Sequence, residues 1–354
     1  MKSRFLDARN CHALLPSSQG LPTTQRLDEC LHQINDHNDK FSGLIDKLVE
    51  YNKKTINNSA GVSRLQPVPI DIAQGINIAE RTIHTQALVR PEKSPLLLNI
   101  VFEYENHASW KIVLPLQYLL KGWGDANRGY QCYVHTIARN MPQVGTVQQL
   151  IQREADQRDN YNYVGITGRN WLLRLSEHLR EINSGSRRTF YKAWRDNLGI
   201  KDVLYISQLS DINLEYEDAM NWEEIFVDKI ASGPNGLNMI PGGFKGLKFL
   251  HQLRITDKIN VSIEDRDKAI GEYIRQNPRK GIPNPFISEL WENDDYYLRV
   301  IEARPKTLSV DQVKKIRELG KMGWPVSQIA NEVKALNETQ VKNVLAGKTY
   351  QRVR

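Results

Sequence analysis

The residues best suited to chemistry lie close together, where a tyrosine-rich segment leads into a helix-forming run. Tyr163 lies in that segment, and Arg174 and His178 follow it with a spacing of four residues. Residues four apart share one face of a helix, so Arg174 and His178 are predicted to act at one place. An arginine pairs well with phosphate oxygens, and a histidine and a phenol can hold a proton beside them. The stretch predicts phosphodiester chemistry; the alternative is an ordinary amphipathic helix with two polar surface residues.

A helix over 171–182 would position the arginine and the histidine. At about 100° per residue, its apolar residues gather in one stripe, which consists of Trp171, Leu172, Leu175, Leu179 and Ile182. Arg174 and His178 border that stripe, so we expect both at the rim of a cleft.

A strand over 161–166 would position the tyrosine. Side chains alternate along a strand, which places Tyr161, Tyr163 and Gly165 on the same face. The missing side chain of Gly165 leaves room for a close approach by another group.

A second group of polar residues lies over 221–230 and 236–243, where two adjacent glutamates compete for a functional role. If residues 221–230 form a helix, its apolar residues lie on one side of it; they are Trp222, Ile225, Phe226 and Ile230. Glu223 then lies at the edge of the apolar face, and Glu224 points away from it. We therefore expect Glu223 to act at the site; a solvated surface glutamate is the alternative.

Taken together, these residues resemble the GIY-YIG endonuclease family. The matching residues, in the order of the family, are Tyr163, Gly165, Arg174, His178, Glu223 and Asn238. The resemblance implies an α+β fold with a small antiparallel sheet flanked by helices. It also implies hydrolysis of phosphodiester bonds in double-stranded DNA.

The resemblance assigns a role to each residue. Glu223 would hold one Mg²⁺ or Mn²⁺ ion, with water in the remaining coordination positions, and the ion would act as a Lewis acid on the scissile phosphate. Arg174 would neutralise charge on the phosphate, and His178 would form a hydrogen bond to a tyrosine or to the phosphate. Asn238 would have a structural role, tying the last strand to the metal-binding helix.

The first tyrosine motif departs from the family pattern. The best candidate is Tyr133, in a run where Gln-Cys stands in place of the family's Gly-Ile, and Tyr130 competes with it. Family members join the two tyrosine strands by a short hairpin, whereas 29 residues, 134–162, intervene here. Residues 146–153 in this insertion read as a helix. Tyr163 or Tyr133 would deprotonate or position the attacking water.

Charge and length are consistent with a DNA-binding enzyme. The 354 residues allow two or three domains, and 48 basic against 41 acidic residues give a net charge of +7. A pI near 9.1 favours a polyanionic partner. Arg187 and Arg188, which follow the helix over 171–182, are expected to contact DNA. Much of the excess charge lies in residues 306–354, which hold ten basic and four acidic side chains.

This C-terminal segment reads as three short helices, over 308–320, 325–333 and 337–347, with Ser309 and Asn337 as caps. Short basic three-helix units with a tight turn before the last helix match the helix-turn-helix pattern. The segment resembles the small modules appended to many mobile-element endonucleases.

If the segment is a helix-turn-helix, its last helix should face DNA. The residues expected there are Thr339, Gln340, Lys342 and Asn343, with Lys348 and Arg352 on phosphates. A helical packing or oligomerisation module is the alternative.

Cysteine usage and hydropathy exclude several classes of protein. Cys11, Cys30 and Cys132 are widely spaced and odd in number, so we expect neither a disulfide framework nor a zinc site. No apolar run approaches about 18 residues, and the first residues lack the apolar core of a signal peptide. We expect a reduced cytoplasmic protein without membrane contact, associated with the nucleoid through DNA.

The expected domain organisation has four parts. They are a mainly helical accessory domain with some strands over 1–127, a nuclease domain over 128–245, a charged connector over 246–305, and the helix-turn-helix over 306–354. In the accessory domain, apolar residues at roughly helical spacing predict paired amphipathic helices within 24–52, and strands are expected around 97–104 and 110–114. The expected function is a metal-dependent DNA endonuclease, and homing, restriction and repair roles stay open, as does a homodimer. The alternative is a non-catalytic DNA-binding regulator on a degenerate nuclease scaffold.

Overall fold

The computed structural model divides the chain into two compact units, Met1–Ile282 and Pro283–Arg354. The structure describes residues 3–15, 20–55, 64–104, 107–139, 160–200, 202–233, 235–278, 281–282, 291–302 and 306–353. The helix expected over 146–153 lies outside these residues. In the described part of the chain, no helix combines the length and the apolar character needed to cross a membrane.

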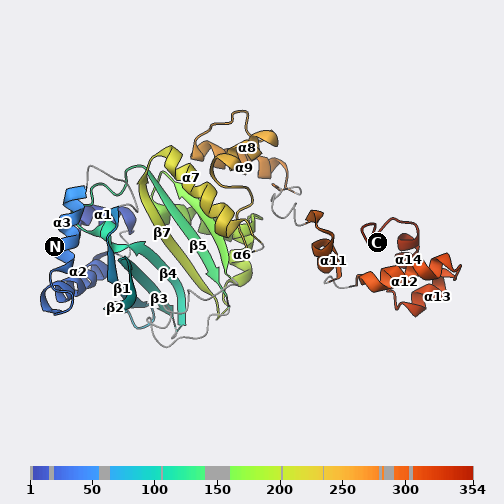
Figure 1. The fold of residues 1–354 in the computed structure, drawn as a ribbon, viewed down its shortest axis with the longest axis horizontal. Coiled ribbons are helices and arrows are strands. Elements are labelled where there is room, and N and C mark those ends of the chain that lie inside the picture. The colour runs from blue at the N-terminus through green and yellow to red at the C-terminus, as the bar shows by residue number, and fades with distance from the viewer. Residues whose placement is uncertain are drawn as a thin grey trace. The chain divides into compact units, whose positions relative to one another are not determined.

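One mixed sheet of seven strands organises the first unit (Figure 1). The strands are β1 (Pro67–Asn77), β2 (Thr82–Pro95), β3 (Leu97–Tyr104), β4 (His107–Pro115), β5 (Tyr130–Ala138), β6 (Tyr161–Thr167) and β7 (Leu204–Leu214). Their order across the sheet is β2-β1-β3-β4-β7-β5-β6. The pairs β1/β3 and β4/β7 are parallel, and the other neighbours are antiparallel.

The size of this sheet corrects an expectation. The chain is α+β, as predicted, but a small antiparallel sheet confined to 128–245 is wrong. β4 pairs in parallel with β7, with Trp110 opposite Tyr205, and so joins strands from 1–127 to strands from the nuclease region. The boundaries expected after residues 127 and 245 therefore lie inside the first unit. No strand was predicted for β1, β2 or β7.

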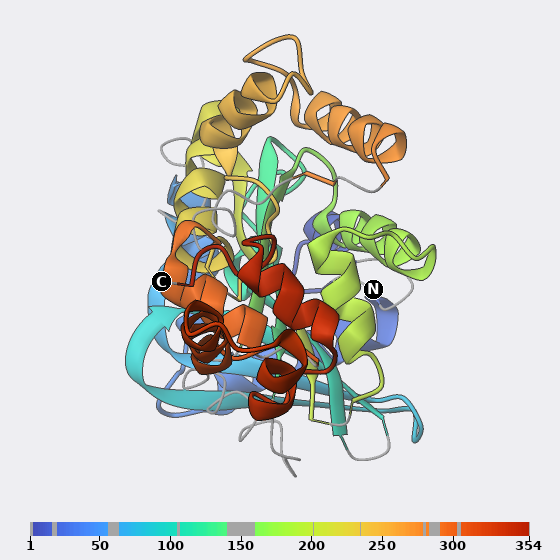
Figure 2. The same cartoon turned by 90° about the vertical axis from the view of Figure 1, so that its right-hand side faces the viewer.

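Helices cover both faces of the sheet. Those of the first unit are α1 (Ala8–Leu14), α2 (Gly20–His37), α3 (Leu44–Thr55), α5 (Trp171–Asn183), α6 (Thr189–Asn197), α7 (Tyr216–Phe226), α8 (Gly243–Gln252) and α9 (Ile263–Gln276). The strands around 97–104 and 110–114 and the helix over 171–182 are confirmed. Figure 2 shows α9, in orange, at the same end of the first unit as α8.

The N-terminal helices pack at the end of the sheet that carries β1 and β2 (Figure 1). Asn35 joins α2 to α3, because its side-chain oxygen accepts hydrogen bonds from the backbone nitrogens of Ile45 at 3.0 Å and Asp46 at 3.1 Å. The paired helices expected here are confirmed. The expectation that residues 1–127 form a mainly helical domain is wrong, since β1 to β4 come from the same region.

The three strands nearest the functional region are β7, β5 and β6, which run antiparallel to one another. Alternation along β5 sends Tyr133 to one face and Cys132 to the other. α5 and α6 pack on the Tyr133 face, where Trp171 and Phe190 are buried. α7 and α8 pack on the Cys132 face, where Met220 is buried. β6 is the edge strand, and the helices of the two faces meet beyond it.

The second unit is helical. It contains α11 (Asp294–Glu302), α12 (Val310–Lys321), α13 (Val326–Glu332) and α14 (Glu338–Leu345). Ser309 begins α12 with a capping box, and Asn337 caps α14. Its core includes Val313, Ile316, Ile329, Val341 and Val344. The three helices predicted in this segment are confirmed.

Candidate active site

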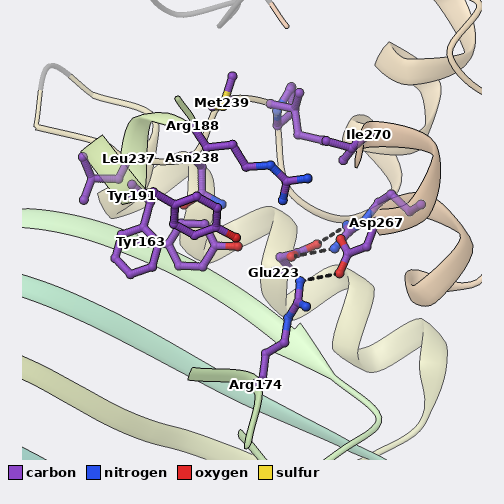
Figure 3. A pocket seen from close by; sticks show the side chains of 14 residues that line it. Tyr163, Arg174, Arg188, Tyr191, Glu223, Leu237, Asn238, Met239, Asp267 and Ile270 are labelled. Atoms are coloured by element: carbon purple, nitrogen blue, oxygen red, sulfur yellow. Dashed lines mark hydrogen bonds and ion pairs between the residues drawn. The ribbon is translucent and has the colours of Figure 1, made fainter. Parts of the chain in front are cut away.

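A cavity of about 80 Å³ lies beside β6, at the edge of the sheet (Figure 3). Its polar and charged lining residues are Tyr163, Arg174, Arg188, Tyr191, Glu223, Asn238, Arg266 and Asp267. They come from β6, α5, α6, α7, the segment after α7, and α9. Most of them were predicted to be functional.

Asn170 begins α5 and thereby positions the residues that follow. Its side-chain oxygen accepts hydrogen bonds from the backbone nitrogens of Leu172 at 2.9 Å and Leu173 at 3.0 Å, as an N-cap does. Arg174 lies at the rim, with 15% of its side chain exposed. His178 is 1% exposed, so its expected position at the rim is wrong. α6 packs over the imidazole and closes it into the core.

His178 bridges two tyrosines. Its Nε2 lies 3.3 Å from the hydroxyl of Tyr133, and its Nδ1 lies 2.9 Å from the hydroxyl of Tyr191. Burial, with the positive charge of Arg174 nearby, lowers the pKa of His178 well below its usual value. The imidazole is therefore neutral, with one nitrogen donating and the other accepting. It holds two phenols in place rather than exchanging protons with solvent.

The two tyrosine strands place their phenols differently. Tyr133 lies opposite Gly165, and a Cβ on Gly165 would lie 2.6 Å from the Tyr133 hydroxyl, so the glycine makes room for this ring. Burial raises the pKa of Tyr133 well above its usual value. Tyr163 lines the cavity, and burial raises its pKa as well. The competing Tyr130 packs against Tyr216 in the core of the opposite face.

Glu223, and not Glu224, lines the cavity. The buried face of α7 contains Met220 and Glu223 itself, whereas Ile225, expected on the buried side, is 61% exposed. The predicted face was wrong at Ile225, because packing of Met220 against the sheet decides the rotation of α7. The other predicted residues, Trp222, Phe226 and Ile230, are partly buried against the core. Glu224 instead accepts a hydrogen bond from the backbone nitrogen of Lys245 at 3.1 Å.

The carboxylate of Glu223 is held by α9 and by a glycine turn. Arg266 donates from Nη1 to Oε2 at 2.7 Å and from Nη2 to Oε1 at 3.2 Å. The backbone nitrogen of Gly243 donates to Oε2 at 2.9 Å. Gly243 has a φ of +54°, and a Cβ there would lie 2.1 Å from the carbonyl oxygen of Met220. The glycine therefore lets the turn approach α7 closely enough to reach the carboxylate.

Arg174 is held at the cavity by two carboxylates. Its Nη1 donates to Glu177 at 2.8 Å, and its Nη2 donates to Asp267 at 2.5 Å. Glu177 also pairs with Arg169 at 2.6 Å. Asp267 belongs to α9, so the same helix that neutralises Glu223 also neutralises Arg174.

A second arginine reaches the cavity from α6. Arg188 precedes the first turn of α6, and its guanidinium lies 5.7 Å from the ring of Tyr191. Figure 3 shows the Arg188 side chain pointing into the cavity. Its neighbour Arg187 is exposed and donates to the carbonyl of Pro278 at 3.3 Å.

Asn238 connects the segment after α7 to the edge strand. Its amide nitrogen donates to the carbonyl of Val164, and its amide oxygen accepts from the backbone nitrogen of Val164, each at 2.9 Å. The backbone nitrogen of Asn238 donates to Ala231, at the end of the π-helical turn that continues α7. These bonds hold one wall of the cavity against β6.

In this arrangement the residues do not fit an Mg²⁺ or Mn²⁺ ion at Glu223. Both carboxylate oxygens accept hydrogen bonds from Arg266, whose guanidinium supplies positive charge at the point where a cation would bind. Hard divalent cations take several oxygen ligands, and the nearby Asp267 carboxylate faces Arg174 instead. Within the described residues, no group of three or more histidine, cysteine, aspartate or glutamate side chains is arranged to hold a metal.

In the second unit, several predicted DNA contacts are exposed. The side chains of Thr339, Lys342 and Lys348 are exposed, and that of Asn343 is half-buried. Lys342 lies 3.4 Å from Glu338, one turn earlier on α14. Exposed pairs of this kind contribute little to stability, so Lys342 can exchange this partner for another anion.

Two other predicted contacts are engaged within the second unit. The amide of Gln340 donates to the carbonyl of Lys306 at 2.8 Å and accepts from the backbone nitrogen of Leu336 at 2.9 Å. Arg352 pairs with Asp294 at 2.7 Å. Both side chains join segments of this unit, and reading a base or a phosphate would require them to leave these partners.

Arg266 and Asp267 were not predicted to be functional, because 246–305 was expected to be a charged connector. A signal was present: Ile263, Arg266, Asp267 and Ile270 have the spacing of one helical face. Because the two isoleucines are expected to face the core, the two charged side chains on the same face are expected to face it as well. Buried charges of this kind require oppositely charged partners.

His135 was also missed, although it lies two residues after Tyr133 on β5. It is fully buried beside the stacked rings of Tyr163 and Phe190, at centroid distances of 6.3 Å and 5.8 Å from them. Its Nδ1 lies 3.1 Å from the hydroxyl of Ser207, and its Nε2 has no hydrogen-bond partner among the described residues. Burial, with a smaller contribution from Arg174, lowers the pKa of His135 to about 3.

The chain was compared with protein families, with curated proteins and with solved structures, and none of the three comparisons found a match.

His135 should make the folded protein sensitive to acid. The unfolded chain binds a proton at this residue near pH 6.5, and the folded chain does not. Its contribution to stability is therefore complete above about pH 6.5 and is lost as the pH falls toward about 3. Between about pH 7.5 and pH 5, His135 alone should lower the free energy of unfolding by roughly 2 kcal/mol.

Urea unfolding of wild type and His135→Phe at the two pH values measures this contribution. The phenylalanine variant should lose about 2 kcal/mol less than wild type over the same interval. His37→Gln, which removes an exposed histidine at the end of α2, serves as the control and should behave like wild type. Equal losses in wild type and His135→Phe would contradict the assignment.

Proposed function

We propose that the first unit is a nuclease domain of the GIY-YIG kind, which hydrolyses phosphodiester bonds of double-stranded DNA. One observation carries the proposal. Tyr163, Arg174 and Glu223, from three separate segments, line one cavity. Behind it, His178 links Tyr133 to Tyr191.

The local topology also supports this proposal. β7, β5 and β6 form an antiparallel trio, α5 follows β6 and α7 follows β7. An antiparallel trio with helices on both faces, although it is one end of a larger sheet, is compatible with the arrangement that the resemblance implies.

The chemistry would begin with capture of a phosphate by arginines. Arg174 and Arg188 both line the cavity, and guanidinium groups donate well to phosphate oxygens. In the transition state, a positive charge beside the phosphorus lowers the energy of the growing negative charge. We assign this role to Arg174, because it lies at the rim and its donors are directed to carboxylates that a phosphate can replace.

Tyr163 would position the attacking water. Of the two motif tyrosines, Tyr163 lines the cavity whereas Tyr133 is 1% exposed. Since burial raises the pKa of Tyr163, its phenol keeps its proton and orients the water through a hydrogen bond. Tyr133 and His178 would act as positioning residues behind it.

The second unit would supply DNA binding as a helix-turn-helix. It has a compact three-helix core, a capped last helix, and exposed basic residues on and after that helix. Phosphate contacts by such lysines position a protein on DNA, and side chains that reach base edges confer sequence preference.

One observation favours a second candidate, a DNA-binding regulator without catalysis. The carboxylate of Glu223 is fully paired with Arg266, which is an arrangement that a decayed nuclease can tolerate. A regulator of this kind would bind DNA without cutting it, whether or not Mg²⁺ is present.

Arg174 provides the sharpest test of the proposed chemistry. Arg174→Gln should lower the single-turnover rate of DNA cleavage at saturating protein by about 10² to 10³, because one aligned positive charge is lost. The control is Arg169→Gln, since Arg169 pairs with the same Glu177 but is half exposed. It should cut nearly as fast as wild type. If Arg174→Gln weakens only DNA binding, Arg174 is a phosphate contact and not a catalytic residue.

Lys348 provides a test of the second unit. Its exposed side chain follows the end of α14, and Lys348→Gln should weaken binding to every DNA duplex and reduce the slope of log affinity against log salt by about one. Lys315→Gln is the matched control, because Lys315 is neutralised by Glu332 at 2.5 Å. The same change of slope in both variants, or in neither, would argue against phosphate contact by Lys348.

A further inference from the structure

α9 delivers two opposite charges to the cavity from adjacent positions. Arg266 pairs with Glu223 of α7, and Asp267 pairs with Arg174 of α5 at 2.5 Å (Figure 3). The resemblance implies an ion at Glu223, and the proposed function assigns a phosphate to Arg174. α9 therefore supplies an opposite charge to both Glu223 and Arg174.

Arg266 and Asp267 also resemble a cation and a phosphate in their chemical groups. The guanidinium of Arg266 takes the place of a cation, because it donates hydrogen bonds to both carboxylate oxygens of Glu223. A carboxylate beside an arginine takes the place of a phosphate, because both present anionic oxygens to the same donors. The dipeptide Arg266-Asp267 thus reproduces the charge pattern of an ion and a DNA phosphate in the site.

α9 is anchored in the core mainly through its first turn. Ile263 anchors its first turn in the core with Met220 and Leu247, and Tyr216 donates to the carbonyl of Val261 at 3.0 Å. Ile263 and Arg266 are the buried residues of α9. Little apolar surface would be exposed if the helix swung outward about its first turn.

The ion pair that holds α9 is also imperfect. Arg266 is 7% exposed, and its Nε has no hydrogen-bond partner in the described part of the chain. Removing both charges of a pair from water is costly, and an unsatisfied donor adds to that cost. An incoming cation and phosphate therefore compete with a pair that is only partly compensated.

We propose that α9 is an inhibitory lid. Arg266 and Asp267 occupy the positions of a cation and a phosphate, and the site opens when α9 moves away. This inference rests on the proposed function, because it describes the regulation of that site.

Binding of Mn²⁺ tests the Arg266 half of the lid. Calorimetric titration of the full chain with MnCl₂ should show about tenfold or more tighter binding to Arg266→Gln than to wild type, because Glu223 is released. Adding Glu223→Gln to that variant should remove the gain. Arg275→Gln changes an exposed residue of the same helix, paired with Glu272, and should bind Mn²⁺ like wild type. Equal affinities of wild type and Arg266→Gln would overturn the lid.

Binding of inorganic phosphate tests the Asp267 half, in a variant that leaves the buried pair intact and so should fold. Asp267→Asn should bind phosphate about tenfold or more tightly than wild type, because Arg174 loses a competing anion. The gain should vanish when Arg174→Gln is added. Asp265→Asn is the matched control, since Asp265 is exposed and pairs with Lys268 at 3.5 Å. If Arg266→Gln does not fold, this result alone decides.

These measurements separate the lid from the nuclease. Both gains in affinity without DNA cleavage by any variant would support the lid and refute the nuclease. Cleavage by wild type without either gain would support the nuclease and overturn the lid.

Discussion

The buried ion pair between Glu223 and Arg266 is the interaction on which the candidate site depends. Two charges have left water, and each is tolerated only because the other is present. Removing one partner of such a pair costs about 3 to 5 kcal/mol. The pair therefore links α7 to α9, and the close turn at Gly243 adds a third contact to the same carboxylate. α9 lies over the cavity because this carboxylate needs a cation.

A second constraint comes from strand register. Tyr133 lies over Gly165 because these residues face each other across β5 and β6. A slip of one residue would send both to the opposite face of the sheet, and the phenol would lose its hydrogen bond to His178. The neutral imidazole and its two phenols satisfy one another inside the core. A buried polar network of this kind is stable only when its members are paired.

Features encoded locally were predictable from the sequence. The helix that begins at Asn170, the strand that carries Tyr163 and the three helices of the second unit follow from periodicity and capping residues. The large sheet was not predictable in this way, because β4 and β7 meet through residues such as Trp110 and Tyr205 that lie far apart in sequence. The rotation of α7 was missed for a related reason: packing against the sheet, and not local hydrophobicity, buries Glu223 and exposes Ile225.

The central claim is that this site cuts DNA, and nicking of supercoiled plasmid by the full chain in Mg²⁺ tests it most directly. Wild type and Glu224→Gln should convert the plasmid to open circles, whereas Glu223→Gln should not, because Glu223 lines the cavity and Glu224 is bound to the backbone of Lys245. If none of the three proteins produces open circles although each still binds the plasmid, the claim is contradicted. The chain would then be a DNA-binding protein without nuclease activity.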